Sequence, residues 1–143
     1  MGDAMNGKVL IIGLGIIVGV FVIAVMSART PNATTDQSGA VLYARNCASC
    51  HGRNLEGQAN WQTQNTDGSW PAPPHDETGH TWHHRDDYLI GVILYGGAAV
   101  TGNPLNRMPA FNTVLTNEDA TAIIEYIKST WSDEIREKQK TGH

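Results

Sequence analysis

The chain has 143 residues, with 10 lysine or arginine and 14 aspartate or glutamate side chains, so its formal net charge is −4. This acidic balance argues against nucleic acid as a partner, and the length suits one domain with an appendage. Two cysteines are too few for a disulfide framework or for a zinc site of four thiolates.

An apolar run lies near the start of the chain. It extends from Val9 to Met26 without a charged residue, and as a helix it would measure roughly 27 Å, enough to cross the hydrocarbon core of a membrane. We therefore expect a cytoplasmic arm at residues 1–8, a transmembrane anchor at residues 9–28 and a polar linker at residues 29–38. A cleaved signal peptide is the alternative, although its apolar part is usually only about 7–15 residues long.

Three helices are expected in a globular part that covers residues 39–131. The first runs from Gly39 to about residue 48, and the second covers about residues 85–94, where apolar side chains recur at helical spacing. The third begins after Thr116, a good N-cap followed by acidic residues, and carries an apolar stripe. The charged residues 132–143 are expected to form a solvated extension of that helix.

Two long segments without periodicity separate these helices, at residues 52–84 and 96–115. A loop of roughly 30 residues is uncommon in a compact domain. Such loops are expected here if they wrap a large group that is not protein.

The sequence CASCH contains both cysteines, Cys47 and Cys50, with His51 directly after them. This spacing is the attachment signature of haem c: the two thiols bind the vinyl groups of one porphyrin, and the histidine ligates the iron. A redox dithiol is disfavoured because no strand-like run precedes the motif. A zinc site that uses nearby histidines is conceivable, but their spacing does not match a zinc finger; these histidines are His75, His80, His83 and His84.

Met108 is the methionine of the globular part, in the segment RMPAF, and no apolar stripe explains it. We predict that it binds the iron opposite His51. The alternatives are a histidine ligand from His80, His83 or His84, or an open site. Histidine–methionine ligation saturates the iron, which indicates one-electron transfer rather than chemistry on a small-molecule substrate.

With these residues in view, residues 39–131 resemble the class I monohaem cytochromes c. The resemblance rests on the order of four segments: GAVLYARNCASCHG, then WPAPPH with GHTWHH, then RMPAF, then LTNEDATAIIEYIKSTW. It implies an all-α fold of three main helices and long loops around one covalent haem c, here preceded by the single transmembrane helix. In such a fold the first and last helices cross, and Gly39 permits their close approach.

The resemblance also implies residues around the haem. A proline carbonyl after the haem motif accepts the proton of the ligand histidine, and either Pro73 or Pro74 would supply it here. Trp82 is a candidate to direct its indole N–H toward a haem propionate, or to be ordinary core. Trp70 and Arg107 are further candidates for propionate contact.

We therefore expect a membrane-tethered electron carrier rather than an enzyme. Its haem domain would lie on the periplasmic side of a bacterial inner membrane and exchange electrons with redox proteins in or at that membrane. A fixed subunit of a larger respiratory or photosynthetic complex is the second reading. A haem sensor or peroxidase-like enzyme is the third, and it requires an open sixth position.

Overall fold

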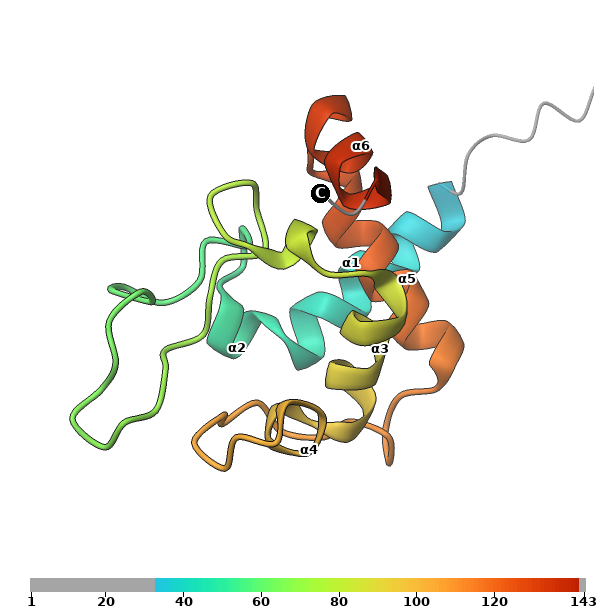
Figure 1. The fold of residues 1–143 in the computed structure, drawn as a ribbon. Coiled ribbons are helices and arrows are strands. Elements are labelled where there is room, and N and C mark those ends of the chain that lie inside the picture. Colours follow the sequence, from blue (N-terminus) through green and yellow to red (C-terminus); the bar gives the residue numbers. More distant parts are fainter. Residues whose placement is uncertain (1–32, 142–143) are drawn as a thin grey trace, which may run out of the picture.

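The computed structural model describes residues 33–141, in which helices are joined by long loops and no strand is present (Figure 1). The helices are α1 (Ala33–Asn46), α2 (Ala48–His51), α3 (Asp86–Tyr95), α4 (Gly97–Thr101), α5 (Asn117–Ser129) and α6 (Asp133–Thr141), with a 3-10 turn η1 (Thr81–His83). The all-α prediction is confirmed for these residues. Within them, no helix combines the length and apolar character needed to cross a membrane, and the anchor expected at residues 9–28 lies outside the described part.

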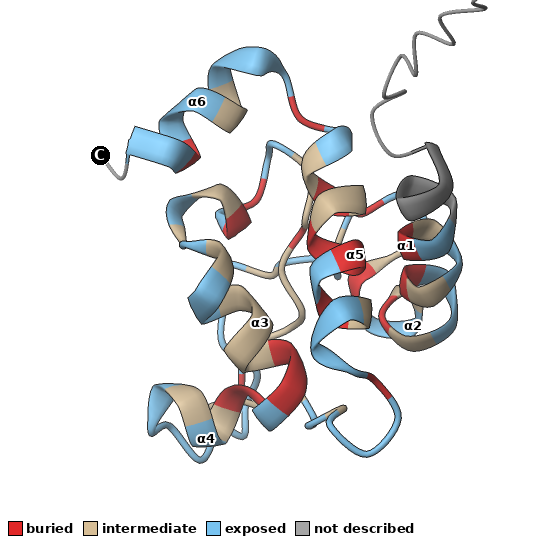
Figure 2. Ribbon diagram, turned by 90° about the vertical axis from the view of Figure 1, so that its right-hand side faces the viewer, coloured by how far each residue is buried: buried red, intermediate tan, exposed pale blue. Residues whose placement is uncertain are grey.

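Helices α1 and α5 cross and pack closely (Figures 1 and 2). Gly39 lies at the contact: a Cβ atom there would come within 2.1 Å of the Ala122 carbonyl oxygen. One turn later, the buried Tyr43 ring packs at 5.5 Å from the ring of Tyr126. The expected close approach at Gly39 is therefore present.

Helix α5 forms for the reasons that its sequence indicated. Thr116 and Asp119 make a reciprocal capping box, in which each side chain accepts from the other residue's backbone N–H. The apolar stripe of this helix is buried in the core (Figure 2), and it comprises Ala120, Ile123, Ile124 and Ile127. Helix α5 packs against both α1 and α3.

Helix α1 begins six residues before the predicted start at Gly39, inside the segment expected to be a linker. This segment lacks an apolar stripe, which is why periodicity did not reveal it. A helix can extend beyond its packed face, because each added residue costs less once the helix has been nucleated.

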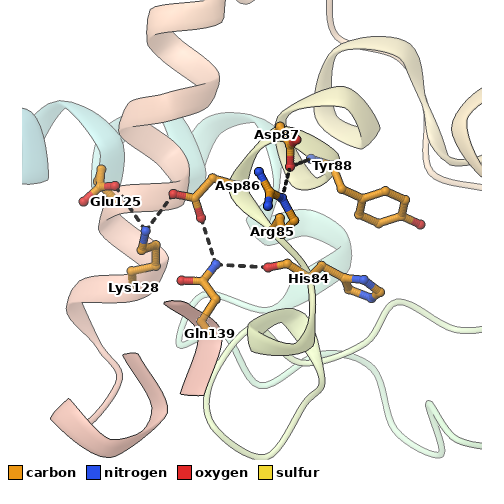
Figure 3. Close-up of polar contacts among 8 residues, drawn as sticks. All are labelled: His84, Arg85, Asp86, Asp87, Tyr88, Glu125, Lys128 and Gln139. Atoms are coloured by element: carbon orange, nitrogen blue, oxygen red, sulfur yellow. Dashed lines mark hydrogen bonds and ion pairs between the residues drawn. The ribbon is translucent and has the colours of Figure 1, made fainter. Parts of the chain in front are cut away.

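Helix α6 is docked on the domain, whereas a solvated extension was expected at residues 132–143. Gln139 is buried and donates to the Asp86 carboxylate at 2.8 Å and to the His84 carbonyl at 3.1 Å (Figure 3). The other oxygen of Asp86 accepts from Lys128 of α5 at 2.8 Å. Asp86 therefore joins the start of α3 to both α5 and α6.

Candidate functional site

A cavity of about 710 Å³ lies between α2, α3, α5 and the two long loops. Its lining contains both cysteines, His51 and Met108, so the structure brings together the four residues predicted to hold the haem. Its apolar walls come mainly from α3, α5 and the methionine loop, and include Leu89, Val92, Ile93, Phe111, Ile123, Ile124 and Ile127.

The haem-attachment motif follows directly from α1. The Cys47 N–H donates to the Tyr43 carbonyl at 2.8 Å, which carries the helical pattern into the motif, and α2 then places Cys50 and His51 one turn further on. Both thiols are free. Cys47 is buried, and this burial, together with the nearby Cys50, raises the pKa of its thiol to about 11, whereas Cys50 is exposed.

His51 is oriented by a backbone carbonyl. Its Nδ1 lies 2.9 Å from the Pro73 oxygen, and because a carbonyl can only accept, Nδ1 carries the proton and Nε2 keeps its lone pair. Burial lowers the pKa of His51, and the bond to Pro73 partly opposes this shift; the net lowering favours the neutral ring. Of the two prolines considered, Pro73 makes this bond, while the Pro74 carbonyl faces the Thr81 hydroxyl at 3.4 Å.

Two further residues that the sequence analysis did not assign to the site support His51. The ring of His75 stacks on the His51 ring, with centroids 4.0 Å apart, and its Nδ1 bonds the Thr81 hydroxyl at 2.8 Å. The Tyr43 hydroxyl donates to the carbonyls of His51 and Gly52 at 3.3 and 3.0 Å. Neither contact has a sequence signal, because the His75 ring comes from the loop 24 positions further on and the bonds of Tyr43 depend on how α1 continues into α2.

The methionine loop is fixed from its α4 side. The Met108 carbonyl accepts from the Gly97 N–H at 2.9 Å, and the Met108 N–H donates to the Asn106 side chain at 3.2 Å. Gly97 leaves no room for a side chain, because a Cβ atom there would lie 1.9 Å from the Asn106 oxygen. The consecutive glycines Gly96 and Gly97 were the sequence signal for this close approach.

The propionate candidates occupy different places. Trp70 and Arg107 line the cavity, and Arg107 also makes an ion pair with Asp67 at 2.9 Å. Trp82 is not part of the lining; its indole N–H, expected to face a propionate, donates instead to the Gly79 carbonyl at 3.1 Å. Trp82 packs against the core, which was the other reading of this residue.

The histidines after the prolines do not form a metal centre. Among residues 33–141, no group of three or more His, Cys, Asp or Glu side chains is placed to hold a metal ion. His80 stacks on Trp61 at 5.7 Å and His84 on Tyr88 at 4.7 Å, while His83 stacks on Trp82 at 3.7 Å. The zinc reading of the cysteine motif therefore has no support in the described residues.

The residues present fit a haem. Cys47, Cys50, His51 and Met108 all line one cavity whose walls are largely apolar, and both thiols are free, which suits a flat apolar macrocycle that is bound covalently at one edge. No carboxylate belongs to the lining formed by the described residues, so no like charge opposes the propionates inside the cavity. A helical domain with this arrangement has the architecture of a c-type cytochrome.

Comparison with known proteins agrees with this architecture. Residues 34–127 match the family described as cytochrome c oxidase, cbb3-type, subunit III, so the chain belongs to that family and is a class I c-type cytochrome with covalently bound haem c. The fructose dehydrogenase cytochrome subunit of Gluconobacter japonicus is 35% identical over 108 residues, which cover 72% of this chain and 20% of that protein. The chain thus spans about a fifth of the length of this relative. No solved structure matches this chain significantly.

Proposed function

We propose that the chain is a one-electron carrier whose haem iron is bound by His51 on one face and Met108 on the other. One observation supports this above all: both side chains line the same cavity, and the bond to Pro73 leaves Nε2 of His51 available as a ligand. When bound, the haem supplies a one-electron iron couple. His51 and Met108 would together hold the iron, which would leave no position for a substrate and suit the transfer of one electron.

The axial pair can be tested with the purified holoprotein. We expect the oxidised protein to show the long-wavelength methionine–iron charge-transfer band, and Met108→Ala to abolish it. His80→Gln and His84→Gln are the matched controls, because both rings line the cavity, and both variants should keep the band. Fast and complete binding of carbon monoxide to the reduced wild-type protein would contradict a six-coordinate carrier and favour the sensor or peroxidase reading.

The proposal includes a membrane tether at residues 9–28, with the haem domain on the periplasmic side of a bacterial inner membrane. The apolar run supports the tether, and haem c attachment takes place outside the cytoplasm. We expect the haem to remain in the membrane fraction after a carbonate wash. A variant in which a cleavable signal peptide replaces residues 9–28 should release the haem domain into the soluble fraction. Release of the haem domain from the unmodified chain by the same wash would refute the tether.

A fixed subunit of a larger complex is the second candidate. The relative with 35% identity is named as a cytochrome subunit of a dehydrogenase, and the matched family is named after an oxidase subunit. Extraction in mild detergent separates the two candidates. Stoichiometric co-purification with other redox subunits supports the fixed subunit, whereas a haem protein that elutes alone supports the free carrier.

A further inference from the structure

The two loops that line the cavity are joined by an ion pair. Arg107 Nη2 lies 2.9 Å from an Asp67 carboxylate oxygen, although the two residues are 40 positions apart. Asp67 belongs to the loop after the haem motif, and Arg107 directly precedes Met108. This pair, which we name the loop bridge, therefore connects the predicted sixth ligand to the opposite loop.

The Asp67 carboxylate of the loop bridge is also held by its own loop, independently of Arg107. Its other oxygen accepts from the Ser69 N–H at 2.9 Å and from the Ser69 hydroxyl at 2.6 Å. Ser69 is only 4% exposed, and its hydroxyl also accepts from the Asn65 amide at 3.0 Å. The bonds from Ser69, and then the charge of Arg107, lower the pKa of Asp67 and keep it ionised. A pre-oriented partner reduces the entropy that an exposed ion pair otherwise loses on forming.

A second contact joins the same two loops. The Leu105 side chain packs over Gly68, where a Cβ atom would lie 3.1 Å from Leu105 Cδ1. Leu105 and Arg107 thus both meet the turn at residues 67–69, one by an apolar contact and one by charge. Both contacts therefore attach the methionine loop to this turn.

The other bonds of the methionine loop show why its attachment to this turn matters for Met108. On one side, the Met108 backbone is fixed by Gly97 and Asn106. On the other side of the cavity, the contacts described for this loop are the loop bridge and the packing of Leu105. After Met108, the N–H groups of Phe111 and Asn112 also donate to the carbonyls of Ile93 and Leu94 in α3, at 3.1 and 3.0 Å. Opening the bridge would therefore release the attachment of the methionine loop to the loop after the haem motif, while its bonds to α3 and α4 stay in place.

We propose that Asp67 is a positioning residue that keeps Met108 on the iron by holding Arg107 across the cavity. The inference rests on the proposed ligation by Met108. Without the loop bridge, the methionine loop opens more often, and an external ligand then reaches the ferric iron in place of the sulfur. The bridge does not change the identity of the ligand; it changes the fraction of time for which the ligand is displaced.

The test measures the rate at which imidazole replaces the methionine in the oxidised full-length holoprotein. Asp67→Asn keeps the shape of the side chain and its acceptor for Ser69 but removes the charge, and we expect imidazole to enter about three- to fivefold faster. Arg107→Gln should give the same increase, and the double variant should be no faster than either single variant. The charge-transfer band of the resting protein should remain in all three.

Asp87→Asn is the matched control. It removes an ion pair with Arg85 that is at least as exposed as the loop bridge, but that pair lies within one short segment. This variant should exchange imidazole at the wild-type rate. Unchanged exchange in Asp67→Asn and in Arg107→Gln would overturn the inference while leaving the axial pair intact. A wild-type protein without a methionine–iron band would overturn both the inference and the ligation on which it rests.

Discussion

At the scale of single residues, the proposed iron ligand His51 is oriented by a backbone atom rather than by a side chain. The Pro73 carbonyl holds Nδ1 of His51 at 2.9 Å, so no substitution at position 73 removes the acceptor directly. The position of that carbonyl depends on how closely its neighbours pack. Gly57 is the neighbour that matters, because its φ is +69° and a Cβ atom there would lie 2.5 Å from Pro74 N and 2.7 Å from the Pro73 carbonyl carbon.

Gly57→Ala should therefore displace the Pro73 carbonyl and weaken its bond to His51. A less basic imidazole stabilises ferric iron less well, so we expect the midpoint potential to rise. Gly102→Ala is the control: its φ of +68° imposes similar backbone strain, but a Cβ atom there meets nothing within 4 Å. Equal potentials in the two variants would show that the carbonyl does not tune the iron.

The same scale shows what a single sequence can reveal about the site. Cys47, Cys50, His51 and Met108 could be proposed as the site because their chemistry is rare in the chain and the spacing of the cysteine motif is diagnostic, and the structure places all four in the lining of one cavity. The choice between Pro73 and Pro74 could not be made from the sequence, because it depends on the path of a loop without periodicity. His75 was considered as a metal ligand or a loop residue, and nothing in the sequence indicated that its ring would stack on His51.

At the scale of helices, the domain depends on the crossing of α1 and α5. Gly39→Ala should destabilise it by about 1–3 kcal/mol, because the new Cβ atom would overlap the Ala122 carbonyl and force the helices apart. Gly91→Ala in α3 is the matched control, since a Cβ atom there has nothing within 4 Å. It should be neutral or stabilising by up to about 1 kcal/mol, because alanine favours the helix.

Urea unfolding of the holoproteins, followed by far-UV circular dichroism, measures both changes in the free energy of unfolding. A Gly39→Ala variant as stable as Gly91→Ala would mean that α1 and α5 do not need the contact that the structure shows.

Helices α5 and α6 show which features of the fold sequence patterns can predict and which they cannot. The capping box and the apolar stripe of α5 are local features, so the position of this helix could be predicted. The docking of α6 could not be predicted, because its attachments are scattered in a mostly charged segment: the buried amide of Gln139, the bonds of Arg136 to the carbonyls of Lys128 and Trp131, and the packing of Ile135 on the core. Residues 133–141 lie beyond the part that matches the family, so no resemblance indicated this attachment either.

At the scale of the whole molecule, the core and the haem cavity share their residues. Ile123, Ile124 and Ile127 are buried in the core and also belong to the cavity lining. A domain of this size has little other apolar surface to bury, so the group that fills the cavity contributes a large part of its stability.

Cys47→Ala combined with Cys50→Ala prevents attachment, and we expect this variant to lose much of its helix content and its cooperative unfolding transition. Far-UV circular dichroism before and during heating checks both. Met108→Ala is the comparison, because it keeps the covalent haem and should keep the helices. A cooperative transition at the wild-type temperature without haem would show that the helices form a sufficient core by themselves.

The early start of α1 has a consequence for how far the haem can travel. The helix has 14 residues and measures roughly 21 Å, and it leads directly into Cys47. With the proposed anchor at residues 9–28, four residues separate the bilayer segment from a stiff rod that ends at the haem. If the proposed tether holds, this short separation would keep the haem close to the membrane surface, and the proteins that exchange electrons with it would have to present their own redox centres there.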